Sequence, residues 1–425
     1  MTDGQGPLTR RAFLEQMAIT IGGSLLVTTA CAPPARGTSS VPAQQAAASA
    51  TAVPLSMKVE KPELTLGFIP ITCSTPVIMA DPLGFYTRYG LNVTVKKFAG
   101  WADIRDAFIA KEIDAAHLLA PIPLATTIGV GGTQVPALLA AVQNINGQAI
   151  TLANNLKERV TGPQDFKGLR MAVPFDFSMH NFLLRHYVST GGLDPTKDLE
   201  IRVMRPPDMV ANLASGNIDG YLGPDPFNQR AVFENVGYLH MLSKEMWLGH
   251  PCCGFVTSRE FKEKNPGTYT ALSQAIVDAS LYAHKPENRK QIAEAIAPSN
   301  YLNQPVEVIE AVLSGKFHDG KGGNFDEPNR IDFDPYPWKS FAFWMTSQMV
   351  RWGYVTPELA AGLDYKKLAD EVFMTGDVRQ ALERAGVAAP KDEYRKETIM
   401  GKVFDPDNVA EWTQPRVAAL AIPAA

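Results

Sequence analysis

The sequence predicts an α/β fold built from two similar lobes that close on each other like a clamp. Strands and helices alternate from residue 62 onward, one helix-to-strand pattern occurs twice, and the composition changes sharply near residue 60. The 425 residues are 45% hydrophobic and 20% charged, which is enough for two or three domains with a sizeable core. The net charge of −4 argues against a general nucleic-acid binder, which needs a basic face.

The N-terminus reads as a signal peptide. A charged stretch, residues 9–14 (TRRAFL), precedes an apolar run over residues 17–27. The paired arginines resemble a twin-arginine export signal, and an amphipathic helix is the alternative. Cys31 follows Ala30 as in lipoprotein signals, so we expect a lipidated Cys31 that anchors the protein to a membrane surface. A plain cut after Ala32 is the competing interpretation.

A linker follows the signal. Residues 32–57 are mostly Ala, Ser, Thr, Pro and Gln, a composition that cannot bury enough apolar surface to order itself. We therefore predict a signal peptide over residues 1–31 and a flexible linker over residues 32–60. The remainder would be an exported domain held on a tether.

The first elements of the folded body alternate in type. Residues 64–70 and 91–95 have the alternating apolar pattern of strands, and helical stretches follow over residues 77–84 and 104–111. Strand, helix, strand and helix in this order favour a parallel sheet covered by helices.

The repeated pattern occupies residues 102–123 and 207–226. Each copy has a helix of similar length, then Ile-Asp, then a proline seven residues after the aspartate. Any helix-to-strand turn could look like this, so one repeat is weak evidence alone. It nevertheless suggests two lobes that each place a strand end and a Pro-bearing loop at a shared cleft, where α/β sheets bind ligands. Two hinged lobes of this kind close around a ligand.

The boundaries of the lobes follow from the same pattern. Lobe one is predicted to comprise residues 61–150 plus 249–425, and lobe two residues 151–248. Within lobe two, residues 168–174 favour a short strand and residues 181–189 a helix that stops at two glycines. Residues 266–313 and 340–383 have amphipathic, Ala-rich helical patterns, which we expect to pack around lobe one.

Motifs of catalysis are absent from the sequence. It contains no G-x-S-x-G elbow, Walker A loop, H-E-x-x-H or C-x-x-C motif. The adjacent pair Cys252-Cys253 has the wrong spacing for a zinc knuckle. We therefore predict a binding protein, not an enzyme, and no cofactor.

Several segments together resemble a known family. The order and spacing of the following segments carry the resemblance: WADIRD (residues 101–106), HLLAPIP (117–123), NGQ (146–148), His180, GGLDP (191–195) and GHP (249–251). Over residues 64–354 the chain is similar to the nitrate- and bicarbonate-binding proteins of ABC importers. The resemblance implies a type II periplasmic-binding-protein clamp outside the cytoplasm, often lipid-anchored. Such a clamp delivers a small planar anion to a membrane permease and its ATPase.

Three residues match ligand-contacting positions of that family. They are Trp101, Gln148 and His180, each of which offers an N–H donor to a desolvated oxyanion. Each also has a purely structural interpretation. Trp101 could be an aromatic residue of the lobe core, Gln148 could form a hydrogen bond at the hinge, and His180 could simply begin a helix.

The chain departs from the family just after His250-Pro251. Nitrate binders carry a Lys there and bicarbonate binders an acidic residue nearby, whereas this chain has Cys252 and Cys253, of which we favour Cys253 for that place. A thiol supplies no cation. We therefore expect a small inorganic or organic anion other than nitrate as the ligand, with Cys253 shaping the pocket.

Two further positions are candidates for the cleft wall. Cys73 lies in the first strand-to-helix loop, and three interpretations of the cysteines stay open: a disulfide or inert packing, a thiol-lined pocket wall, or a soft-metal site with His250 or His180. Asp225 at the end of a lobe-two strand either orients a ligand amine or donor, or forms an Asx turn before a proline.

Two other functions compete with import. An enzyme like the thiamine-pyrimidine synthases of the same superfamily has a cysteine cluster, but the export signal argues against it. A sensor would hand the closed clamp to a signalling partner instead of a permease.

Overall fold

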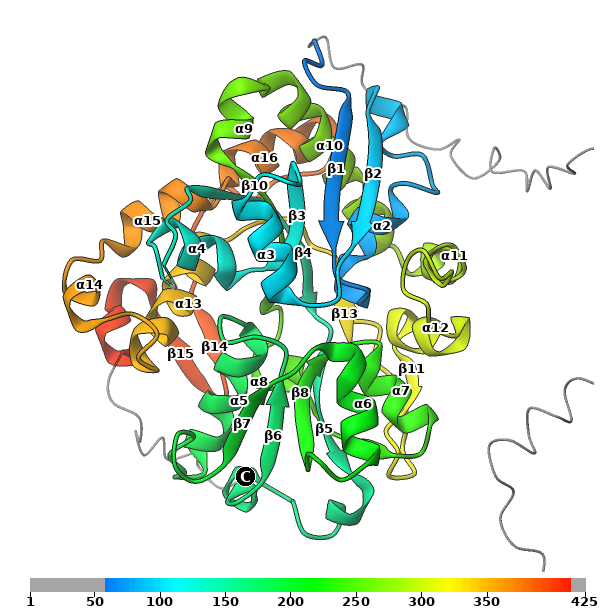
Figure 1. Cartoon of the computed structure of the whole chain (residues 1–425), viewed down its shortest axis with the longest axis vertical. Coiled ribbons are helices and arrows are strands. Elements are labelled where there is room, and N and C mark those ends of the chain that lie inside the picture. Colours follow the sequence, from blue (N-terminus) through cyan, green and yellow to red (C-terminus); the bar gives the residue numbers. More distant parts are fainter. Residues whose placement is uncertain (1–57, 131, 414–425) are drawn as a thin grey trace, which may run out of the picture. The chain divides into compact units, whose positions relative to one another are not determined.

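Two separate β-sheets organise the computed structural model, which describes residues 58–130 and 132–413 (Figure 1). All of these residues belong to one unit, Gln44–Ala425. The predicted signal peptide, Cys31 and nearly all of the predicted linker lie outside the described residues. Within the described part of the chain, the helices are too short or too polar to cross a membrane.

The first sheet has six strands in the order β13-β4-β10-β3-β1-β2. Their bounds are β1 Glu63–Phe68, β2 Asn92–Lys97, β3 Ala115–Leu119, β4 Ala137–Asn146, β10 Pro251–Ser258 and β13 Ile331–Asp332. β1 pairs in parallel with β2 and β3, whereas β10 runs antiparallel between β3 and β4. The chain therefore leaves this sheet after β4 and returns to its centre as β10. The helices that follow β1, β2 and β3 are α2 (Thr75–Met79), α3 (Trp101–Ile109) and α4 (Pro121–Thr127).

The second sheet has five strands in the order β7-β6-β8-β5-β9. Its elements are β5 Gln148–Ala153, β6 Arg170–Val173, α5 Met179–Thr190, β7 Glu200–Val203, α6 Pro206–Ala214, β8 Gly220–Pro224, α7 Phe227–Phe233, β9 Gly237–Leu242 and α8 Ser243–Met246. β6 is parallel to β7 and β8, and β5 is antiparallel to β8 and β9. β5 begins three residues before the predicted start of lobe two at residue 151.

A single glycine separates the two sheets on the outward crossing. Gly147 lies between β4 and β5 with φ of 82°, a left-handed conformation that glycine adopts without strain. A Cβ at this position would lie 2.8 Å from the Ile331 side chain. The N–H of Gly147 donates to the Arg330 carbonyl, and its own carbonyl accepts from the Asp225 N–H. The crossing therefore needs glycine and is hydrogen-bonded on both sides.

The repeated Ile-Asp pattern has the same structural role in both sheets. Asp114 precedes β3 and accepts the backbone N–H of Thr65 in β1, while Asp219 precedes β8 and accepts the N–H of Arg170 in β6. Each carboxylate thus joins the start of its own strand to the start of the parallel neighbour. The predicted repeat is confirmed as α3-β3-α4 and α6-β8-α7.

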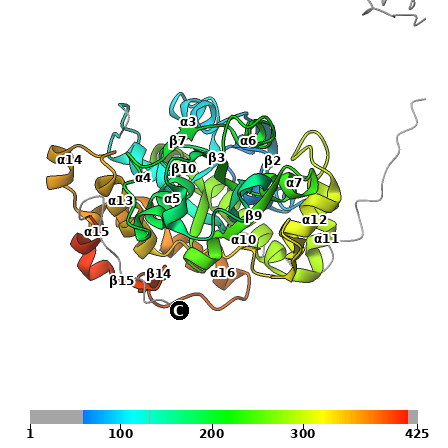
Figure 2. The ribbon, with the colours of Figure 1, turned by 90° about the horizontal axis from the view of Figure 1, so that it is seen from below.

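The C-terminal helices contact helices of both sheets. The sequence predicts that they pack around lobe one alone. α13 (Lys339–Arg351) packs against α4 and also α5, and the Asn181 side-chain amide donates to the Tyr354 hydroxyl at 2.6 Å. Figures 1 and 2 show α13–α15 on one side of the sheets and α11 and α12 on the other. The remaining elements are α9 Arg259–Lys264, α10 Pro266–His284, α11 Arg289–Ile296, α12 Val306–Ser314, β11 Lys316–His318, β12 Asn324–Asp326, α14 Pro357–Ala361, α15 Tyr365–Val372, α16 Thr375–Arg384, β14 Glu397–Ile399 and β15 Lys402–Phe404.

Candidate functional site

The loop after β1 meets the loop after β8. The backbone N–H and the hydroxyl of Thr72 both donate to the Asp225 carbonyl, at 2.9 and 3.0 Å. Both loops follow the carboxyl ends of strands, the place where α/β sheets expose their ligand sites. The candidate site is therefore built where the two sheets approach each other.

The three ligand residues expected from the resemblance all begin structural elements. Trp101 is the first residue of α3, Gln148 the first of β5, and His180 lies in the first turn of α5. Each is at most 1% exposed. Within residues 58–130 and 132–413, the Trp101 Nε1, both amide atoms of Gln148 and both ring nitrogens of His180 have no hydrogen-bond partner. Buried polar atoms normally have partners, so these atoms are available to a ligand.

His117 belongs with these three residues, and the sequence reasoning missed it. Its ring centroid lies 5.4 Å from that of Trp101, and neither ring nitrogen has a hydrogen-bond partner among the described residues. It occupies the middle of β3, a strand that is otherwise apolar and fully buried. His117 is the first residue of the HLLAPIP segment. A single histidine in a buried strand does not indicate a ligand site unless its neighbours in the folded structure are known.

Electrostatic coupling connects the two histidines of this group to the cysteines. Cys252 acts on the pKa of both His117 and His180, so both imidazoles lie near the same sulfur. Gln148 pairs in register with Pro224, next to Asp225, and Asp225 in turn acts on the pKa of Cys73. Another buried indole, that of Trp344, also lacks a hydrogen-bond partner within the described part of the chain. What distinguishes Trp101 is its place among these groups.

Burial keeps the histidines of the site uncharged. It lowers the pKa of His117 to about 3 and that of His180 to about 4. At neutral pH each imidazole therefore offers one N–H donor and one acceptor nitrogen. Together with the Trp101 and Gln148 N–H groups, they form a neutral, donor-rich set.

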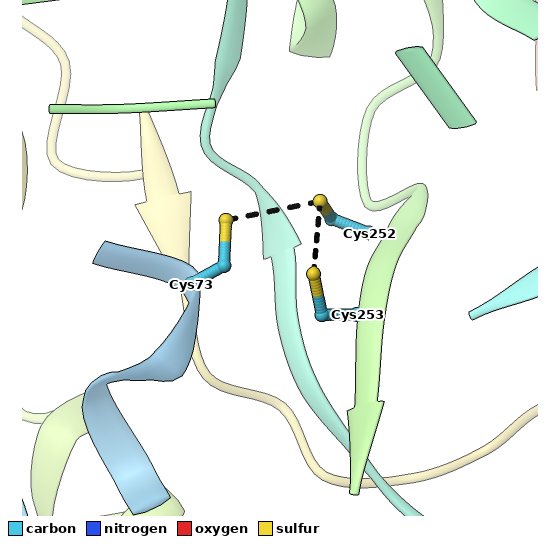
Figure 3. Close-up of side chains that lie close together, drawn as sticks. All are labelled: Cys73, Cys252 and Cys253. Carbon is cyan, nitrogen blue, oxygen red and sulfur yellow. Dashed lines mark hydrogen bonds between the residues drawn. The ribbon is translucent and has the colours of Figure 1, made fainter. Parts of the chain in front are cut away.

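The three described cysteines lie side by side as free thiols (Figure 3). The Cys252 Sγ is 3.7 Å from the Cys73 Sγ and 3.5 Å from the Cys253 Sγ. Adjacent residues of a regular strand point to opposite faces, so Cys252 and Cys253 should not meet. The β10–β4 pairing shifts register on both sides of Cys253, and such a bulge redirects side chains. No disulfide joins these three residues.

The central thiol differs from the outer two. Burial raises the pKa of Cys73 and Cys253. Burial also acts to raise the pKa of Cys252, but hydrogen bonds from Cys253 and Cys73 outweigh it and lower that pKa. The hydrogen bonds thus make Cys252 the most acidic of the three thiols.

Thiol titration tests the state of the cluster. In a Cys31→Ser chain that has never been reduced, we expect three thiols to react after unfolding and none to react quickly in the folded protein, because all three are fully buried. A parallel sample treated with reductant should give the same count. One reactive thiol instead of three would show a disulfide between two of them.

Asp225 is held by a partner that the sequence did not reveal. The Arg330 guanidinium, directly before β13, donates to both carboxylate oxygens, with distances of 3.0 and 3.1 Å, and both side chains are fully buried. Burial raises the pKa of Asp225 and lowers that of Arg330, and the contact between them opposes both shifts. Asp225 thus joins the end of β8 to the first sheet, and its carboxylate is already satisfied.

The sequence of this chain is similar to those of known binding proteins and of one ATP-binding protein. A model of the NMT1-like family matches residues 57–297. The chain is 31% identical to the nitrate/nitrite binding protein NrtA of Synechococcus elongatus over 375 residues, which cover 81% of this chain and 84% of the relative. It is 33% identical to the nitrate import ATP-binding protein NrtC of Synechocystis over 70% of this chain, but spans only 47% of NrtC.

A solved structure supports the architecture. The crystal structure of the periplasmic nitrate-binding protein NrtA from Synechocystis superposes with a TM-score of 0.80 and 28% sequence identity, covering 84% of this chain and 99% of that chain. The predicted two-lobed α/β clamp is confirmed by this likeness. The resemblance predicted over residues 64–354 is confirmed as well.

Proposed function

Because the chain belongs to the NMT1-like family, we propose that it is the solute-binding component of an ABC importer. Its relatives include a nitrate/nitrite binding protein, and part of a nitrate import ATP-binding protein resembles most of this chain. The two sheets, with crossings at Gly147 and between β9 and β10, serve as the lobes of a clamp that delivers its ligand to a permease and its ATPase. The protein binds its solute and does not transform it.

The ligand is a small anion of the nitrate-like, nitrite, bicarbonate or small organic anion class, with nitrate itself disfavoured because a thiol supplies no cation. The observation that carries this proposal is the group of four buried side chains with unpartnered polar atoms: Trp101, His117, Gln148 and His180. A desolvated anion must recover hydrogen bonds lost from water, and the N–H groups of these four side chains can supply them. Cys253, in place of the Lys of the nitrate binders, shapes the wall and changes which anion fits.

The protein acts outside the cytoplasm. A periplasmic relative with the same fold and the export-type sequence of residues 9–27 support this location. Cys31 is the proposed lipid-attachment residue, and residues 32–60 the linker that leaves the clamp free to meet its permease. Mass spectrometry of the mature N-terminus tests both points.

Anion binding by the purified protein tests the proposed ligand class. Isothermal titration and tryptophan fluorescence with nitrate, nitrite, bicarbonate and methanesulfonate should identify at least one that binds. Loss of one hydrogen bond to a charged group costs about 1.5–3 kcal/mol, so Trp101→Phe or His180→Phe should raise Kd by roughly 10- to 150-fold.

A matched control separates the site from general packing effects. Trp344→Phe makes the same chemical change at another fully buried indole whose Nε1 has no partner among the described residues, and it should leave Kd unchanged. If none of the four anions binds, or if the Trp101 and His180 variants bind as tightly as the parent, the proposed ligand class is wrong.

A further inference from the structure

We propose that Cys73, Cys252 and Cys253 form a binding site for one thiophilic cation of the Zn²⁺ or Cu⁺ class. The three sulfurs lie within 4.8 Å of one another and are fully buried. Figure 3 shows the three sulfurs side by side, Cys73 from the segment after β1 and the other two from β10. The proposal goes beyond the proposed anion binding and does not depend on it.

The spacing of the sulfurs matches that of metal-bound thiolates. Zinc–sulfur bonds are about 2.3 Å long, so two thiolates on a tetrahedral ion are separated by about 3.8 Å. The two shortest separations here are 3.5 and 3.7 Å. A cation therefore needs only small movements of the sulfurs to reach bonding distance of all three.

The donor set selects a soft cation. The group of possible ligand atoms at this place consists of three cysteines and contains no carboxylate. Thiolates prefer Cu⁺ and Zn²⁺, whereas Ca²⁺ and Mg²⁺ require oxygen ligands. The nearby Asp225 carboxylate is already bound by Arg330, so it cannot turn the site into one for a hard cation.

The backbone is shaped to bring the thiols together. Without the irregular register at Cys253, Cys252 and Cys253 would lie on opposite faces of β10. The Thr72 contacts with the Asp225 carbonyl fix the loop that carries Cys73. Packing alone would need neither feature, because any small apolar side chain fills space equally well.

The protein supplies three ligands and leaves a position on a tetrahedral ion. Among the described residues, no imidazole nitrogen or carboxylate oxygen lies within 4.8 Å of all three sulfurs. Three protein ligands with one open position are typical of sites where the metal also holds a small molecule. The coordination proposed here is therefore three-sulfur, with the fourth place taken from outside the chain.

Cobalt titration of the full chain tests the site. Reduced, desalted protein should bind one equivalent of Co²⁺ with thiolate-to-cobalt charge-transfer absorption and the intense visible bands of tetrahedral cobalt, and Zn²⁺ should abolish both. Cys73→Ser, Cys252→Ser and Cys253→Ser should each weaken cobalt binding more than about 100-fold, because even changes around metal ligands cost about 10- to 100-fold. Cys31→Ser, the remaining cysteine, should leave binding unchanged.

The outcomes separate this proposal from the proposed function. Absence of the charge-transfer absorption in reduced protein, or its persistence in all three cluster variants, overturns the metal site. Circular dichroism of the metal-free variants establishes that each is folded. Anion binding measured on metal-free parent protein reports on the proposed function alone, so either proposal can fail while the other stands.

Discussion

Arg330→Met is expected to lower the free energy of unfolding by about 3–5 kcal/mol, the usual cost of leaving a buried charge without its partner. Arg330 and Asp225 are both completely buried and joined by two hydrogen bonds. Removing the guanidinium takes both charged donors from the Asp225 carboxylate, which keeps only the Gln229 backbone N–H at 3.4 Å. It also leaves the Gln229 amide oxygen without its Arg330 donor. Urea unfolding followed by circular dichroism measures the change.

The double variant distinguishes an unpaired charge from lost packing. Asp225→Leu combined with Arg330→Met removes both charges, and we expect it to be more stable than either single variant, since apolar replacements for a buried pair are often neutral. Lys366→Met, which breaks the exposed pair with Asp370, should change the stability by about 1 kcal/mol or less. A double variant as unstable as the sum of the two single variants would contradict the account.

This pair also explains what local sequence patterns could and could not predict. β1, β2 and α3 were recognisable because their periodicity is local, and the Ile-Asp repeat because each aspartate acts on a neighbouring strand. Arg330 lies 105 residues from Asp225, and nothing in the residues around either one indicates the contact. Long-range polar pairs of this kind depend on the finished fold.

The candidate site shows the same division. The resemblance supplied Trp101, Gln148 and His180, but His117 became evident only from its position beside Trp101. The meeting of Cys252 and Cys253 depends on a bulge, and the regular strand that a sequence predicts would separate them. An amphipathic pattern shows which face of a helix is buried, but it does not show which element covers that face. The sequence therefore could not reveal that the C-terminal helices also contact the second sheet.

Acid is expected to destabilise the protein strongly before most carboxylates titrate. Burial lowers the pKa of His117 and His186 to about 3 and that of His180 to about 4. In the unfolded chain a histidine has a pKa of about 6.5. The unfolded state therefore takes up protons first, and stability that is present above pH 6.5 is lost as the pH falls toward 4.

The size of this effect rivals the whole stability of a domain. Each histidine that stays neutral in the folded state lowers the free energy of unfolding by about 1.4 kcal/mol per pH unit below pH 6.5. Between pH 6.5 and 4.5, three of them together cost about 5–8 kcal/mol, compared with the 5–15 kcal/mol that stabilises a typical protein. Carboxylates with lowered pKa, such as Asp194, contribute at lower pH and leave this range to the histidines.

His186 allows one of these contributions to be isolated. It stacks on Trp412, its Nδ1 lies 3.0 Å from the Arg351 guanidinium, and Lys402 adds to the positive surroundings. His186→Gln removes one proton-binding group from the unfolded chain. Between pH 6 and 4.5, the slope of the free energy of unfolding against pH should therefore be smaller than in the parent by about 1.4 kcal/mol per pH unit. Ser189→Ala, in the same helix but without a titrating group, should keep the original slope. Urea unfolding at a series of pH values gives both slopes, and equal slopes for His186→Gln and the parent would mean that His186 is already protonated in the folded protein.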